Sequence, residues 1–170
     1  MSRPLKTNRL KSYLLLSGLI GIGAATQLMA ADTLCSNEET VEFNCSFGKK
    51  LISVCASNDL ATDKGYLQYR FGRNGALEIQ LPEAQTPPGT LVKSGTLSGP
   101  GGNGAYLRFS NEAFNYVVYA SKGKKAGVVV EKGDKLISHV KCRGPAQTAI
   151  GAKLFAKAGL PADEQTFKLP

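Results

Sequence analysis

The chain has 170 residues, a net charge of +8, four cysteines and a single histidine. Zinc sites need close cysteine pairs or histidines at short spacing, and here the closest cysteines are ten residues apart, so we expect no metal site. Only one long apolar run exists, near the N-terminus, so we expect no membrane span in the rest of the chain.

Residues 1–30 have the three parts of a secretory signal peptide. Four basic residues and no acidic one come first, the apolar run of residues 13–25 follows, and small residues stand at Ala30 and Ala31. The run is shorter than the roughly 20 residues that a bilayer core requires. The alternative is a buried N-terminal helix. We expect cleavage near Ala31 or Asp32, which would leave the mature protein periplasmic or secreted.

The mature segment is one domain by its length. About 140 residues are enough to bury a hydrophobic core. Residues 1–30 contain four of the 21 lysines and arginines and none of the 13 acidic residues, so the rest of the chain has 17 basic against 13 acidic residues, a net charge of +4.

Short alternating segments separated by turns predict a mature domain that is all-β. Residues 41–47 have apolar side chains at every second position, Gly48-Lys49 suits a turn, and Asn74-Gly75 is a strong hairpin signal between residues 65–72 and 76–81. The proline-rich residues 82–90 form a connector. Further strands are expected at 50–56, 91–98, 105–110, 113–120, 126–131 and 135–142. We predict an antiparallel barrel or sandwich of 8–9 strands with one short C-terminal helix.

The C-terminal residues predict that helix. Ile150, Leu154 and Ala158 are four residues apart, Gly159 suits a C-cap, and Pro161 follows. We expect the helix to pack outside the sheet and residues 162–170 to be loose. The predicted domains are therefore a signal peptide at 1–30, a disulfide-bonded β domain at 31–146, and a short helix with a loose tail at 147–170.

An even number of cysteines in an exported protein predicts disulfides. With a two-residue turn at 48–49, Cys45 faces the core and Cys55 faces the opposite side, so their Cβ atoms diverge. Cys142 is also expected to face the core. We predict the pairs Cys45–Cys142 and Cys35–Cys55. A three-residue turn would shift the register by one and allow other pairings.

No catalytic or cofactor constellation stands out. Residues 99–104 match G-x-G-x-x-G, but a strand follows where a dinucleotide site needs a helix, so we expect no nucleotide. The only histidine, His139, is expected to face away from Val140 and Cys142, and no two carboxylates are paired by their spacing. We predict a protein that is not an enzyme and has no cofactor.

Four short motifs between residues 43 and 142 resemble the C-type lysozyme inhibitor family of the bacterial envelope. They are Phe43-Asn44-Cys45, Asn103-Gly104-Ala105-Tyr106, Ser121-Lys122-Gly123 and Cys142. The resemblance covers about 100 residues and implies a small exported antiparallel β-barrel whose final cysteine is linked to the first strand. The same layout also suits another exported β-protein family.

In that family, a loop serine and a turn lysine enter the lysozyme active site and contact its acidic catalytic residues. Lys122 matches the lysine, and Asn103 stands in the place of the serine. The resemblance therefore predicts a binding site with Lys122, Asn103 and Tyr106, beside Lys124 and Lys125 of the same turn. The implied partner is a lysozyme or another envelope protein.

Two other functions remain open. Lysines gather in two consecutive turns, and such basic loops suit an anionic glycan or lipid, including lipopolysaccharide and phospholipid. The lysines concerned are Lys122, Lys124, Lys125, Lys132 and Lys135, with Lys49 and Lys50 in an earlier turn. The simpler alternative is that these turns only keep the protein soluble. Besides binding of a polyanion, the other function that remains open is that of an unrecognised hydrolase.

Overall fold

The computed structural model describes residues 32–98, 103–123 and 125–170. Together, these described residues form one compact unit. The predicted signal peptide at 1–30, most of the G-x-G-x-x-G segment (99–102) and Lys124 lie outside the described residues.

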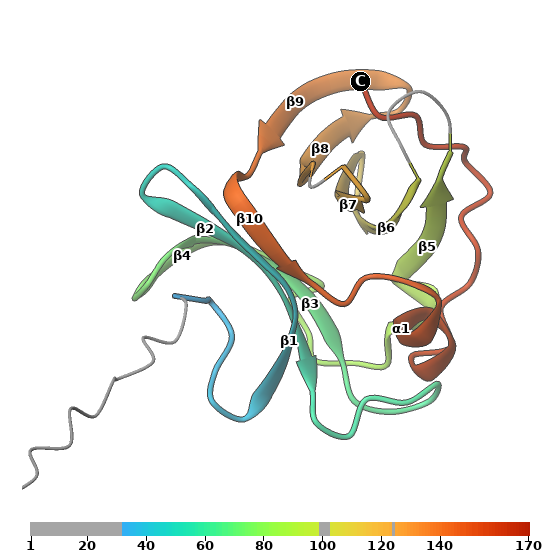
Figure 1. Ribbon diagram of the computed structural model, residues 1–170. Helices are drawn as coiled ribbons and strands as arrows, with labels where there is room; N and C mark the ends of the chain where they lie inside the picture. Colours follow the sequence, from blue (N-terminus) through green and yellow to red (C-terminus); the bar gives the residue numbers. More distant parts are fainter. Residues whose placement is uncertain (1–31, 99–102, 124) are drawn as a thin grey trace, which may run out of the picture. The chain divides into compact units, whose positions relative to one another are not determined.

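The described residues form ten strands in two antiparallel sheets of five (Figure 1). The first sheet has the order β10-β1-β2-β3-β4. Its strands are β1 (Glu39–Phe47), β2 (Lys50–Ser57), β3 (Leu67–Arg73), β4 (Ala76–Leu81) and β10 (Arg143–Thr148). The second sheet has the order β5-β6-β7-β8-β9. Its strands are β5 (Val92–Leu97), β6 (Gly104–Asn111), β7 (Phe114–Ser121), β8 (Ala126–Lys132) and β9 (Lys135–Lys141).

The predicted all-β class is confirmed, and the two sheets form a sandwich, not a closed barrel. Neighbouring strands pair within each sheet, and no ladder joins one sheet to the other among the described residues. Apolar side chains from both sheets form one core, which contains Phe43, Ile52, Val54, Leu107, Phe109, Val118 and Val128. The short 3-10 helix η1 (Pro88–Thr90) lies in the predicted connector between β4 and β5.

The first hairpin has the predicted two-residue turn. Phe47 pairs with Lys50 across it, and Cys45 pairs with Ile52, so Cys45 faces the core. Both predicted disulfides are confirmed, Cys45–Cys142 and Cys35–Cys55. They indicate an oxidising compartment. A register shift between Val41 and Phe43 removes Val41 from the core face, where the alternation had placed it.

The end of the chain differs from the expectation in two ways. Residues 143–148 form β10 beside β1, so α1 spans only Ala152–Lys157. Neither this helix nor any other in the described part of the chain has the length and apolar character of a membrane span.

The prediction of a loose tail is wrong. Phe167 is buried against the outer face of the second sheet, because apolar residues there, including Tyr106 and Val117, would otherwise face water.

Candidate binding surface

The ends of β6 and β7 bring two predicted site residues together. Gly104 pairs with Ser121 at the last position of the ladder. One step beyond, the Lys122 N–H donates to the Asn103 carbonyl at 2.7 Å. We call Asn103, Ser121 and Lys122 the Lys122 edge. Asn103 and Lys122 are exposed there, and the described residues contain no ion-pair partner for Lys122.

A groove of about 470 Å³ lies beside the Lys122 edge. Its walls come from β5, β6 and β7, from the end of β10 and from α1 with the segment that leads into it. The residues that line it are mostly small or apolar, and include Ala105, Ala120, Ile150, Ala152 and Phe155. Ala105 and Ala120 are paired across β6 and β7, and two methyl side chains at facing positions leave space open at this end of the sandwich.

Ser121 contributes a buried polar atom to the same place. Its Oγ is shielded from solvent and has no hydrogen-bond partner among the residues that the structure describes. A buried hydroxyl without a partner is unfavourable by about 1–3 kcal/mol. The Lys122 edge therefore combines an exposed cation, an exposed amide and an unsatisfied hydroxyl next to an apolar groove.

Of the other predicted site residues, Tyr106 lies elsewhere, whereas Lys125 adjoins the edge, since its carbonyl accepts a hydrogen bond from the Ser121 N–H at 2.8 Å. The prediction that Tyr106 belongs to the binding surface is wrong, because its side chain is 3% exposed and lies under the tail. Its ring packs on Phe167, and its hydroxyl donates to Asp163 at 3.1 Å. Burial, followed by the Asp163 charge, raises the pKa of Tyr106 to about 12. Lys125 is exposed in the turn after the edge.

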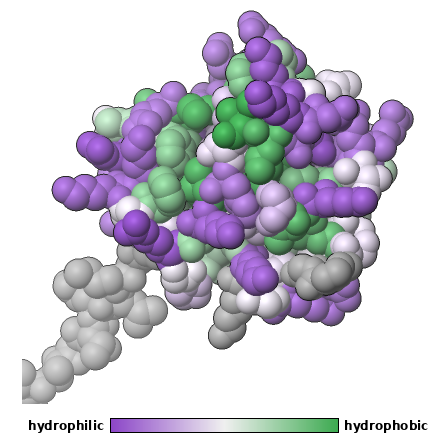
Figure 2. All heavy atoms as spheres, turned by 90° about the horizontal axis from the view of Figure 1, so that it is seen from above, coloured by the Kyte–Doolittle hydropathy of each residue, from purple (hydrophilic) through white to green (hydrophobic). Residues whose placement is uncertain are grey.

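The predicted lysine cluster does not form a single patch. Lys122 and Lys125 precede β8, whereas Lys132 and Lys135 form the turn at its other end. Seven extended residues span roughly 20 Å, so the two turns point away from each other. Lys50, in the earlier turn, pairs with Glu78 at 2.7 Å. One face of the molecule likewise shows hydrophilic side chains interspersed with small hydrophobic patches (Figure 2).

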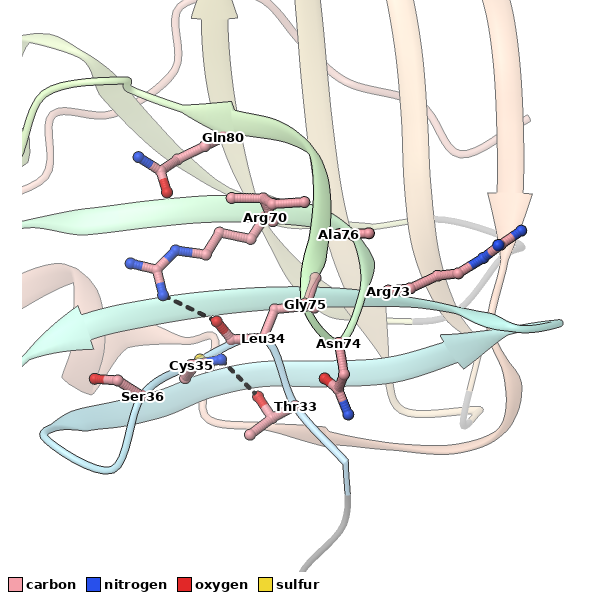
Figure 3. Close-up of a pocket in the computed structure, with 11 residues that line it drawn as sticks. Thr33, Leu34, Cys35, Ser36, Arg70, Arg73, Asn74, Gly75, Ala76 and Gln80 are labelled. Atoms are coloured by element: carbon pink, nitrogen blue, oxygen red, sulfur yellow. Dashed lines mark hydrogen bonds between the residues drawn. The ribbon is translucent and has the colours of Figure 1, made fainter.

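A second, polar pocket of about 420 Å³ lies on the outer face of the first sheet (Figure 3). The N-terminal segment forms one wall and the β3–β4 turn the other. Arg70 crosses between them and donates to the Leu34 carbonyl at 3.0 Å, while Arg73 extends away from it. Arg70 thus fastens the N-terminal segment to β3.

The same guanidinium group of Arg70 also forms a buried ion pair. Its two terminal nitrogens donate to the Glu39 carboxylate at 2.7 and 2.8 Å. Burial alone would raise the pKa of Glu39, but hydrogen bonds from Arg70 and the Ser36 N–H outweigh it and hold the pKa at about 2. The pair is a structural anchor, because both charges are already matched.

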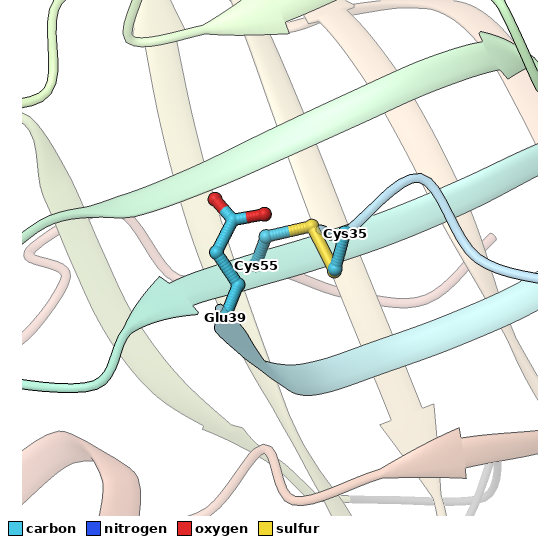
Figure 4. Close-up of side chains that lie close together, drawn as sticks. All are labelled: Cys35, Glu39 and Cys55. Atoms are coloured by element: carbon cyan, nitrogen blue, oxygen red, sulfur yellow. A yellow bond between two sulfur atoms is a disulfide. The ribbon is translucent and has the colours of Figure 1, made fainter. Parts of the chain in front are cut away.

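Glu39 also lies close to Cys35 and Cys55, and the three side chains have the spacing of a metal-binding group (Figure 4). The two sulfur atoms are joined to each other in a disulfide. Metal ligation by cysteine needs a thiolate, so the chemistry of this group does not suit a metal ion while the disulfide is intact.

No protein-family model, no curated protein and no solved structure matches this chain. The resemblance to C-type lysozyme inhibitors therefore stays a prediction.

Proposed function

We propose that this chain is an exported, non-enzymatic binding protein of the bacterial envelope that uses the Lys122 edge to bind a protein partner with an acidic cleft. A C-type lysozyme is the partner that the sequence motifs suggest. The observation that carries the proposal is the 2.7 Å hydrogen bond from the Lys122 N–H to the Asn103 carbonyl. It places the lysine of one motif and the loop of the other side by side.

The chemistry of the edge suits such a cleft. The Lys122 side chain is exposed and has no carboxylate partner among the described residues, so it is available to a partner's acidic residue. Hydrogen bonds between an ammonium and a carboxylate are shorter and stronger than those between neutral groups. The neighbouring groove offers apolar contact area for a side chain that flanks the cleft.

The distribution of lysines favours a protein partner over a polyanion. A polyanion gains affinity from several cations that act together. Here the two lysine-containing turns lie at opposite ends of β8. The edge offers the exposed Lys122 beside an apolar groove, which suits a defined cleft more than an extended charged surface.

Inhibition of muramidase activity tests the proposal. We expect the mature protein to inhibit a C-type lysozyme at micromolar concentration. Truncation of a buried charge pair at an interface costs about 2–5 kcal/mol, so Lys122→Ala should weaken inhibition by at least about tenfold. Lys132→Ala makes the same charge change at the far end of β8 and should leave inhibition intact.

Two results would overturn it. One is the absence of inhibition with the protein in micromolar excess over several lysozymes. The other is an equal loss of inhibition in the Lys122→Ala and Lys132→Ala variants, because that would show an effect of net charge and not of the edge.

A further inference from the structure

A separate cavity of about 310 Å³ lies on the outer side of the second sheet, where the tail passes the edge formed by β7, β8 and β9. The residues that matter for its chemistry are Tyr119, Lys125, His139, Lys141, Leu169 and Pro170. None of the residues that line it also lines the groove beside the Lys122 edge.

A glycine in β8 shapes this cavity. Gly127 pairs with Tyr119 on one side and with Lys141 on the other. A Cβ at this position would lie 3.1 Å from the Tyr119 hydroxyl and 2.1 Å from the Val140 carbonyl. Because Gly127 has no side chain, Tyr119 reaches across β8 to His139, and its hydroxyl lies 2.8 Å from Nε2.

In one of the two tautomers of His139, this contact leaves a donor on the imidazole. Burial raises the pKa of Tyr119, so the phenol keeps its proton at neutral pH. When that hydroxyl donates to Nε2 of a neutral His139, the ring proton resides on Nδ1. His139 then has one N–H free for a further acceptor.

The rest of the lining is cationic on one side and apolar on the other. Lys125 and Lys141 are exposed, and neither forms an ion pair with a described residue. No acidic side chain lines the cavity within the described part of the chain. Leu169 and the Pro170 ring supply an apolar wall from the tail, and the α-carboxylate of Pro170, the last residue of the sequence, offsets one of the two lysine charges.

We propose that this cavity binds a small organic anion. Its carboxylate group lies near Lys125, Lys141 and the His139 ring, and its apolar part packs against Leu169 and Pro170. Two lysines and one ring N–H provide donors for both oxygens of a carboxylate. The volume suits a compact molecule, not a polymer.

The state of His139 in the unliganded protein is consistent with such a ligand. Burial first, and then repulsion from Lys141, lowers the pKa of His139. A bound anion offsets the repulsion and should raise this pKa. By reciprocity, the anion then binds more tightly as the pH falls through the pKa of His139.

His139 is the only histidine in the chain, so its ring protons give a single NMR reporter inside the cavity. We suggest titrating the mature protein with benzoate, acetate and benzamide at low ionic strength. Benzoate should give saturable shifts of the His139 signals and bind at least about tenfold more tightly than either control. Acetate lacks the apolar part, and benzamide lacks the charge.

Each alternative result is decisive. If acetate bound as tightly as benzoate, the apolar wall would have no role in binding. If benzamide bound as tightly as benzoate, the cationic side chains would have none. Either result would contradict the proposal. The absence of saturable shifts with benzoate would overturn the whole proposal.

Lysine variants provide a second test with the same reporter. Lys125→Ala and Lys141→Ala should each weaken benzoate binding by about tenfold. Lys135→Ala removes the same charge from the far end of β9 and should have no effect. Equal affinity in all three variants would contradict the assignment. In the Lys141→Ala variant, whose residue lies outside the predicted lysozyme-binding site, loss of benzoate binding would leave lysozyme inhibition unchanged, so this proposal and the proposed function can fail separately.

Discussion

The Lys122 N–H donates to the Asn103 carbonyl at 2.7 Å and joins the two open ends of the β6–β7 hairpin into one edge. Gly104 and Ser121 pair immediately behind it. The position of the Lys122 side chain therefore depends on the ladder between β6 and β7, which relates the integrity of the fold to the function that we propose.

Gly104 is the residue at which this dependence is easiest to test. A Cβ there would lie 2.2 Å from the Ala120 carbonyl, so Gly104→Ala must push β6 and β7 apart. We expect a loss of about 1–3 kcal/mol in the free energy of unfolding, measured by urea denaturation, together with weaker binding of the partner. Gly123→Ala is the matched control, because no described residue beyond its chain neighbours lies within 4 Å of a Cβ at Gly123. If the two variants were equally stable, the close packing at Gly104 would be refuted.

The two disulfides should contribute unequally to stability. Cys45 and Cys142 are separated by 97 positions, whereas Cys35 and Cys55 are separated by 20. In the chain-entropy model, these loops correspond to about 4.7 and about 3.3 kcal/mol. We expect the Cys45→Ala/Cys142→Ala double variant to be less stable towards urea than Cys35→Ala/Cys55→Ala. The reverse order would show that loop length does not determine their contributions.

The ion pair between Glu39 and Arg70 predicts a pH dependence of stability. The pKa of Glu39 is lowered from 4.5 to about 2, so the folded state holds the charged carboxylate more strongly than the unfolded state does. The charged Glu39 carboxylate therefore adds at most about 3 kcal/mol to the free energy of unfolding. This contribution is present above pH 4.5 and is lost as the pH falls towards 2. Unfolding measured between pH 6 and pH 2 should show this loss in the wild type and a smaller one in Glu39→Gln. Identical profiles would contradict the prediction.

Asp163 should fasten the C-terminal tail to the second sheet. Its fully buried carboxylate accepts a hydrogen bond from Nε of Arg108 at 2.6 Å, and Arg108 is itself 3% exposed. Asp163→Asn leaves the buried Arg108 with one charged partner fewer. We therefore expect the free energy of unfolding to fall by about 3 kcal/mol and the tail to be proteolysed faster. Asp134→Asn, in an exposed turn, is the control. A tail that stays equally protected in both variants would show that the ion pair does not hold it.

Local patterns were sufficient to predict nine of the ten described strands and both disulfides. The two-residue turn at 48–49 fixed the faces of Cys45 and Cys55, and the structure has that register. The core residues of β1 and β2 followed from the same alternation, except at the register shift before Phe43. Such a shift depends on how β1 pairs with its neighbouring strands, and the sequence of β1 alone does not determine that pairing.

The outer faces of the sheets could not be predicted in the same way. Arg70 and Arg108 alternate with core residues, and such positions usually face water. Here the N-terminal segment and the tail cover them, as shown by their exposed fractions of 8% and 3%. Tyr106 was assigned to the binding surface from the motif resemblance alone, which does not show that the tail covers it. β10 was missed because residues 143–148 contain little apolar periodicity, and their strand depends on pairing with β1.

The central claim is that the Lys122 edge is the surface that meets the partner. Amide chemical shifts of the isotopically labelled mature protein, recorded with and without a C-type lysozyme, test it most directly. Our account predicts that the largest changes fall on Asn103, Lys122 and the groove residues Ala105 and Ala120. Changes confined to other surfaces, such as the turn at 132–135, or no changes with lysozyme in excess, would contradict it.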